Sequence, residues 1–140
     1  MTTLEAVSIE RILSPGQVAS GRQAEDLDSR EIARVMVAIQ RMRRDKIEEI
    51  KALAVQVAEA VKIATIVRAE EFLNSEGPQQ QRDQASRLAA AGLVFTAEAL
   101  KAELDAAKES LRLLKDDWDT CRSIGATQRA EKNAIEGYGS

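Results

Sequence analysis

The sequence has no histidine and a single cysteine, Cys121. Histidine is the most common general base and metal ligand, so its absence removes the usual catalytic and zinc-binding chemistry. One cysteine forms no disulfide within the chain and builds no zinc site. The glycine-rich motifs that hold phosphates in nucleotide-binding enzymes are also missing. We therefore expect a protein that is not an enzyme and that binds neither a metal ion nor another cofactor.

Aromatic residues, proline and glycine are also scarce. Aromatics make up 3% of the 140 residues, and there are two prolines and seven glycines. The side chains that dominate instead, such as Ala, Glu, Leu, Lys, Arg and Gln, lose little rotamer freedom in a helix. No stretch approaches the ~20 apolar residues that a membrane span requires, and the first residues lack the pattern of a secretory signal. The sequence predicts an all-α protein of the cytoplasm, which is the host cytoplasm if a phage encodes it.

The first half of the chain divides into an arm and a long helix. Residues 1–28 combine a few apolar positions, which suit a strand or a short amphipathic helix, with loop-forming residues, so we expect a partly irregular arm. Asp28 is suited to cap a helix, with Glu31 three residues later as its capping-box partner. No glycine or proline occurs from there to residue 74. The sequence predicts a helix over 29–74, ~69 Å long at 1.5 Å per residue.

The second half begins with a turn at 75–78, which contains a Gly-Pro pair. Helices are expected over about 79–91 and 96–135. Gly92 either breaks this part of the chain, with Thr96 capping a new start, or only bends it. Together these elements form one predicted helical domain over 29–136, followed by a frayed tail over 137–140.

Apolar residues recur at steps of three and four along both predicted long helices. This spacing indicates a coiled-coil or bundle seam, and the architecture we expect is an elongated helical hairpin. Lys46 falls on the first seam and forms a stutter there. The first seam contains Ile32, Val35, Ile39, Met42, Ile50, Leu53, Val57, Ala60, Ala64 and Val67, and the second contains Leu100, Leu104, Ala107, Leu111, Leu114, Trp118, Cys121 and Gly125.

The apolar surface of one hairpin is too wide for its two helices to bury. We therefore expect a homo-oligomer, because further helices would cover the remaining apolar positions. The interface is predicted at residues 50–67 and 100–121. Its expected contact residues are Leu53, Val57, Val61, Leu104, Leu111, Leu114 and Trp118.

Three carboxylates lie close together at Asp116, Asp117 and Asp119. A hard cation needs five or six converging oxygen ligands, but successive side chains point in different directions around a helix. A solvated helix face is the favoured interpretation of this stretch. Trp118 and Cys121 fall on the seam, and we expect both in the core.

Positive charge gathers in two zones although the whole chain has a net charge of −3. Residues 30–46 carry six basic and two acidic side chains, and residues 120–135 carry three and one. Such zones form either a solvated flank of a coiled coil or a surface that contacts nucleic-acid phosphates. The scarcity of aromatics favours binding to the backbone without base stacking. The candidate nucleic-acid-binding residues are Arg41, Arg43, Arg44, Lys46, Arg122, Arg129 and Lys132.

The layout of residues 27–135 resembles the UvsY-type recombination mediators of tailed phages. The resemblance lies in the start of the long helix at Leu27-Asp28-Ser29 and in its exit from Arg68 through Phe72 to Gly77. It also lies in the closing pattern, which consists of Cys121, Arg122, Ser123, Ile124, Gln128, Arg129, Asn133, Ala134 and Ile135. The resemblance implies a small all-helical protein that assembles into rings and helps to load a RecA-like recombinase onto single-stranded DNA.

Two functions follow from these observations. The first is a non-enzymatic accessory protein of DNA recombination, which binds the backbone of single-stranded DNA as a homo-oligomer and has a RecA-like recombinase as its partner. The alternative is a structural or interaction protein, such as a phage assembly factor or scaffold, that binds no nucleic acid. Neither function involves a membrane.

Overall fold

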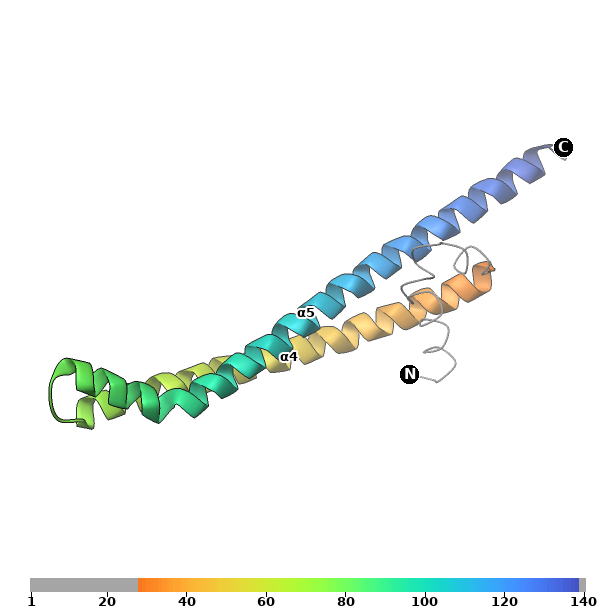
Figure 1. Ribbon diagram of the computed structural model, residues 1–140. Helices are drawn as coiled ribbons and strands as arrows, with labels where there is room; N and C mark the ends of the chain where they lie inside the picture. Colours follow the sequence, from red (N-terminus) through yellow and green to blue (C-terminus); the bar gives the residue numbers. More distant parts are fainter. Residues whose placement is uncertain (1–27, 139–140) are drawn as a thin grey trace. The chain divides into compact units, whose positions relative to one another are not determined.

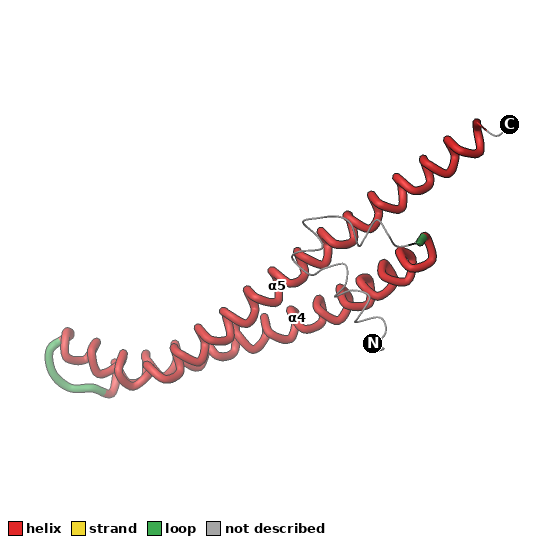
Figure 2. The backbone as a smooth tube through the Cα atoms, turned by 45° about the vertical axis from the view of Figure 1, so that its right-hand side comes forward, coloured by secondary structure: helices red, strands yellow, loops and turns green. Residues whose placement is uncertain are grey.

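The computed structural model describes residues 28–138, and over this range the backbone forms two helices and no strand (Figure 1). Helix α4 spans Ser29–Asn74 and helix α5 spans Gln79–Tyr138. A short loop joins them and is drawn in green in Figure 2. The all-α fold class is thus confirmed. The predicted arm over 1–28 lies outside the described residues apart from Asp28, and so do the last two residues of the predicted tail.

Helix α4 begins at the cap that the sequence predicts. The side-chain Oδ1 of Asp28 accepts a hydrogen bond from the backbone N–H of Glu31 at 2.8 Å. The carbonyl of Asp28 accepts the N–H of Ile32 at 3.0 Å, which is the first helical hydrogen bond. An N-cap of this kind satisfies an N–H group that has no partner within the helix. The observed bounds of α4 coincide with the predicted range 29–74.

The turn after α4 depends on a glycine. Gly77 has a φ of +107°, a backbone conformation that side chains with a Cβ rarely adopt. Just before it, the N–H and the hydroxyl of Ser75 both donate to the carbonyl of Glu71, at 2.9 and 2.6 Å. Pro78 precedes the next helix, and its carbonyl accepts the N–H of Arg82 at 3.1 Å. The polypeptide therefore reverses within a few residues.

Helix α5 is continuous through Gly92, in contrast to the two segments, 79–91 and 96–135, that the sequence predicts. The predicted cap residue Thr96 donates its hydroxyl to the carbonyl of Gly92 at 3.0 Å, so it is bonded within the helix and does not begin a new one. Ala90 and Ala97 are buried on either side of the glycine. Packing on both sides outweighs the modest cost, about 1 kcal/mol, of a glycine inside a helix.

The chain packs as two compact units, each made from a stretch of α4 and a stretch of α5. The described residues of unit 1 are 28–46 and 110–138, and unit 2 comprises 47–109. The sequence predicts a single helical domain over 29–136. The packing divides it near Lys46, the residue at which the seam of the first helix carries a stutter.

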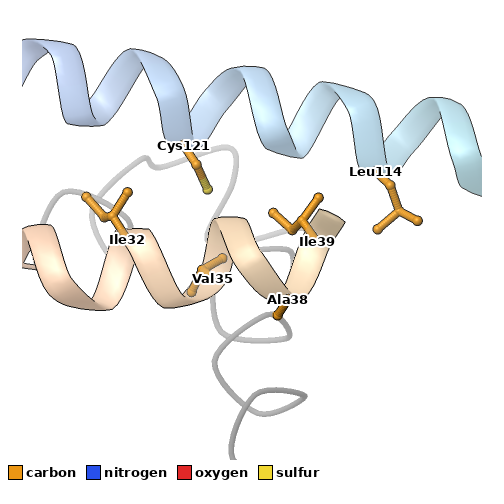
Figure 3. Packing of buried hydrophobic residues seen from close by; sticks show 6 residues of the cluster. All are labelled: Ile32, Val35, Ala38, Ile39, Leu114 and Cys121. Atoms are coloured by element: carbon orange, nitrogen blue, oxygen red, sulfur yellow. The ribbon is translucent and has the colours of Figure 1, made fainter. Parts of the chain in front are cut away.

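The core of unit 1 contains branched apolar side chains together with Ala38 and Cys121. Ile32 and Ile39 of α4 point toward α5, and Leu114 and Cys121 point back toward α4 (Figure 3). Val35 belongs to the same cluster, with 2% of its surface exposed. Each such side chain contributes ~1.5–3 kcal/mol when it is fully buried. Partly buried residues that pack against the cluster are Met36, Met42, Trp118 and Ile124.

The core of unit 2 consists mainly of small side chains. Helix α4 contributes Leu53 and Ala64 to the buried positions. Helix α5 contributes Ser86, Ala90, Ala97 and Ala107. Many of the larger apolar side chains of this unit therefore lie outside its core. They are Ile47, Val55, Val61, Ile63, Ile66, Leu73, Leu88, Val94 and Phe95, all of which are exposed.

The seam of α5 extends beyond the predicted stretch. Every residue predicted in it, from Leu100 to Gly125, is buried or half-buried. The same alternation of four and three residues continues back to Ser86 and forward to Gln128. The added positions are Ser86, Ala90, Leu93, Ala97 and Gln128, all of which are also buried or half-buried.

Candidate nucleic-acid interface

The described residues of the two units carry opposite net charge. Residues 28–46 and 110–138 of unit 1 hold eleven basic and eight acidic side chains, a net charge of +3. Residues 47–109 of unit 2 hold seven basic and eleven acidic side chains, a net charge of −4. All seven candidate nucleic-acid-binding residues belong to unit 1. Among the described residues, the positive charge is therefore concentrated in unit 1.

A row of arginines follows the outer face of α4 in unit 1. Arg41 and Arg44 are both exposed, as the interface hypothesis requires. Arg30 and Arg34 are also exposed, and their spacing places them on the same face of the helix. By the same periodicity this face lies opposite the core. Arg30 and Arg34 are not among the site residues predicted from the sequence, although the helical period places them on the same face as Arg41 and Arg44.

Arg43 and Lys46 differ from their neighbours because both are half-buried. The Nε atom of Arg43 is shielded from solvent and has no hydrogen-bond partner. Long basic side chains in this setting pack their aliphatic stems against apolar surface and place their charged ends in water. These two residues therefore lie nearer the seam than Arg41 and Arg44 do.

The basic residues of α5 lie at a separate place in unit 1. Arg122 and Arg129 line a groove of about 190 Å³ together with residues at the beginning of α4. Ser29 closes one side, and its hydroxyl lies 3.5 Å from the Oε1 atom of Gln128. Lys132 is exposed, and its Nζ atom lies 4.0 Å from a carboxylate oxygen of Glu136. The structure thus brings Arg122 and Arg129 together but does not place them on the arginine row of α4.

The acidic stretch in α5 forms no cation site. Asp116 accepts a hydrogen bond from Arg112 at 2.9 Å. Burial and the nearby charge of Asp116 raise the pKa of the Asp117 carboxyl to about 6. Between residues 28 and 138 no group of three or more side chains of the metal-binding types is arranged to hold a metal ion.

Cys121 and Trp118 occupy the core positions that the sequence predicts, so this prediction is confirmed. The Cys121 side chain is buried, and burial together with the charge of Asp117 raises the pKa of its thiol to about 11. The thiolate is the reactive form of cysteine. Cys121 is therefore a small packing residue that stays protonated at neutral pH.

Most residues predicted at an oligomer interface are used for packing within the chain. Leu53 and Leu114 are buried, and the half-buried members are Val57, Leu104, Leu111 and Trp118. Val61 differs, with 38% of its surface exposed, and it lines a shallow groove of unit 2 beside Ala64. The large apolar side chains that unit 2 leaves exposed are mainly different ones.

No helix among the described residues is long and apolar enough to span a membrane. Comparison of the chain with protein-family models, with curated proteins and with solved structures finds no match.

Proposed function

We propose that this protein is a non-enzymatic accessory factor of DNA recombination that binds the backbone of single-stranded DNA as a homo-oligomer. The observation that carries the proposal is the opposite net charge of the described residues of the two units, +3 and −4. The positive unit also presents four exposed arginines in a row, Arg30, Arg34, Arg41 and Arg44. Such a row is suited to contact successive phosphates of a flexible strand.

The mode of binding follows from the side chains that unit 1 offers. Arginine and lysine release condensed counterions when they contact phosphates, so affinity falls as salt rises. Base stacking would require exposed aromatic side chains. Among the side chains described over residues 28–137, Trp118 is half-buried in the core of unit 1, and Phe72 and Phe95 belong to unit 2. Binding should therefore depend strongly on salt and only weakly on base composition.

An oligomer would extend the DNA-binding surface. Repetition of one chain repeats the arginine row and gives a longer track for the strand than a single helix face provides. The role in loading a recombinase extends this proposal and rests on the resemblance to the UvsY-type mediators. It assigns a RecA-like recombinase as the protein partner.

A titration of labelled single-stranded DNA, followed by fluorescence anisotropy, tests the proposal. For single strands the slope of log K against log [salt] is ~−0.7 for each neutralised phosphate. If the four arginines of one chain each neutralise one phosphate, affinity should fall about fifty-fold between ~50 and ~200 mM salt. Arg41→Gln combined with Arg44→Gln should reduce this loss to about sevenfold.

The matched control is Lys101→Gln combined with Lys108→Gln, which removes the same charge from exposed positions of unit 2. This variant should keep the salt dependence of the unaltered protein, because a contact surface on unit 1 does not use these lysines. An equal loss of affinity in both variants would show that only total charge matters. Absence of binding at low salt would overturn the proposal.

A structural or interaction protein without nucleic-acid binding is the second candidate. The observation that favours it is the exposure of large apolar side chains in unit 2, where Leu88 is 80% and Phe95 76% exposed. Such side chains are typical of contact surfaces for other proteins. A chain that assembles but fails the DNA titration would have this function.

A further inference from the structure

Helix α4 has a second apolar stripe in unit 2, separate from the seam. Val55, Ile66 and Leu73 are 58%, 44% and 74% exposed. They belong to a series at alternating steps of three and four residues, which is the repeat of a two-helix contact. The series lies opposite Leu53 and Ala64, the core residues that α4 supplies. Its members, all exposed, are Ala52, Val55, Glu59, Lys62, Ile66, Ala69 and Leu73. We call this series the outer stripe.

Two opposite charges occupy the middle of the outer stripe. Glu59 and Lys62 stand where a continuous apolar contact would have hydrophobic side chains. Both are exposed. Charged residues at such positions select the orientation and register of a partner helix, since like charges in contact cost energy and opposite charges do not.

The order of the stripe from Ala52 to Ala69 is complementary to its own reverse, and Leu73 lies beyond this stretch. A two-fold axis beside the backbone between Ala60 and Val61 would place Glu59 opposite the partner's Lys62, and Lys62 opposite the partner's Glu59. The same axis places Val55 opposite the partner's Ile66 and Ala52 opposite the partner's Ala69. In a contact with two-fold symmetry every pair of this kind occurs twice. A parallel contact in register would instead place each charge against its own copy.

We propose that the outer stripe of α4 is the docking surface for a second copy of this chain, bound antiparallel with Glu59 and Lys62 in reciprocal ion pairs at its centre. The inference rests on the homo-oligomer of the proposed function and gives it a surface and an orientation. The occupant is a second copy because the charges and the apolar positions match only when the stripe meets its own reverse. The exposed pair Leu88 and Phe95 on α5 has no such pattern of charge.

Charge reversal, read by sedimentation equilibrium of the full chain, tests the pairing. Glu59→Lys alone and Lys62→Glu alone each bring like charges together at the centre of the contact. Each should raise the dissociation constant of the dimer at least about tenfold. The double variant Glu59→Lys with Lys62→Glu restores opposite charges and should return the constant to within about threefold of the original value.

The matched control is Glu103→Lys, the same reversal at an exposed position of α5 outside the stripe. It should leave the dissociation constant unchanged. A double variant that associates as weakly as the single ones would overturn the proposal. A chain that is monomeric at every concentration would overturn it as well.

Cysteine cross-linking tests the orientation independently. In a Cys121→Ala background, the antiparallel contact places Val55→Cys beside Ile66→Cys of the partner subunit. The chain that carries both substitutions should therefore form a covalent dimer on oxidation. The copies of either single site lie eleven residues apart along the helix, ~16 Å at 1.5 Å per residue. A disulfide needs Cα atoms within about 7 Å, so neither single variant should cross-link. Cross-linking of a single variant indicates a parallel contact and overturns the proposal.

The two proposals fail separately. If the dimer shows the predicted response to charge reversal but binds no DNA, the outer-stripe contact is supported and the DNA-binding function is refuted. DNA binding by a chain that shows neither the charge-reversal response nor the double-cysteine cross-link removes the outer-stripe contact alone.

Discussion

The free energy of unfolding should depend on pH through Asp117, and a single substitution at this residue tests the dependence. Its side chain is half-buried, and burial together with the charge of Asp116 raises its pKa to about 6, from 3.8 for an unperturbed aspartate. The folded chain therefore binds this proton more tightly than the unfolded chain does. As pH rises through the window between these two values, the folded state loses stability, and above it the penalty is constant.

The size of the penalty follows from the difference in pKa. At 1.36 kcal/mol for each tenfold change in the ionisation constant, the full difference corresponds to about 3 kcal/mol. Water still reaches part of the carboxylate and screens it, so we expect about 1 kcal/mol at neutral pH. Asp117→Asn removes the charge with little change of shape. It should stabilise the protein by this amount at pH 7 and by nothing below pH ~3.5, where the carboxyl is protonated in both states.

Urea unfolding followed by circular dichroism at a series of pH values measures this difference. The matched control is Asp119→Asn, the same substitution at an exposed position two residues away. The difference in unfolding free energy between Asp117→Asn and the unaltered protein should grow from pH 4 to pH 6 and then level off. A difference that does not change with pH, or one that the control reproduces, would refute burial as the cause.

Two further predictions concern packing and the turn. Ile39→Ala should lower the unfolding free energy by ~2–5 kcal/mol because Ile39 is fully buried. Val37→Ala should lower it by less than ~1 kcal/mol because Val37 is 48% exposed. Similar losses for the two variants in urea unfolding would contradict the assignment of Ile39 to the core. Gly77→Ala should lower the unfolding free energy by ~1–2 kcal/mol because a φ of +107° strains any residue with a Cβ. The added Cβ would lie 2.8 Å from the Oε1 atom of Gln81, the end of a flexible side chain that is able to move aside. Gly92→Ala should instead stabilise by ~0.5–1 kcal/mol because its helical position is open, and the same sign of change for both glycines would refute this reasoning.

The long helices could be predicted because their signals are local. The cap at Asp28 and the glycine at residue 77 are visible in the sequence, and no breaker lies between 29 and 74. At Gly92 the sequence left both a break and a bend open, because a glycine is compatible with either. What keeps the helix intact there is the burial of Ala90 and Ala97, which is a property of the folded chain.

The arginine row was only half predicted for a related reason. The sequence analysis grouped basic residues by their closeness along the chain, which selected Arg41, Arg43, Arg44 and Lys46. On a helix, residues three or four positions apart share a face, and adjacent residues do not. Arg41 and Arg44 are exposed on the helix face that also carries Arg30 and Arg34, whereas Arg43 and Lys46 are half-buried.

Exposure also explains why the contact surface that we propose differs from the interface predicted from the sequence. The sequence analysis took large apolar residues at helical spacing as the contact surface, and in unit 1 such residues do form the core. In unit 2 alanines and Ser86 occupy most buried positions, because small side chains are enough where two helices pack closely. The larger apolar side chains of unit 2 are then exposed, and some of them lie on the proposed outer stripe. Val55 and Ile66 lie on that surface together with Glu59 and Lys62, a combination that a search for hydrophobic repeats alone passes over. In unit 2 the buried residues are mainly small and the large apolar residues are mainly exposed, so burial is the property that distinguishes the core from the proposed contact surface.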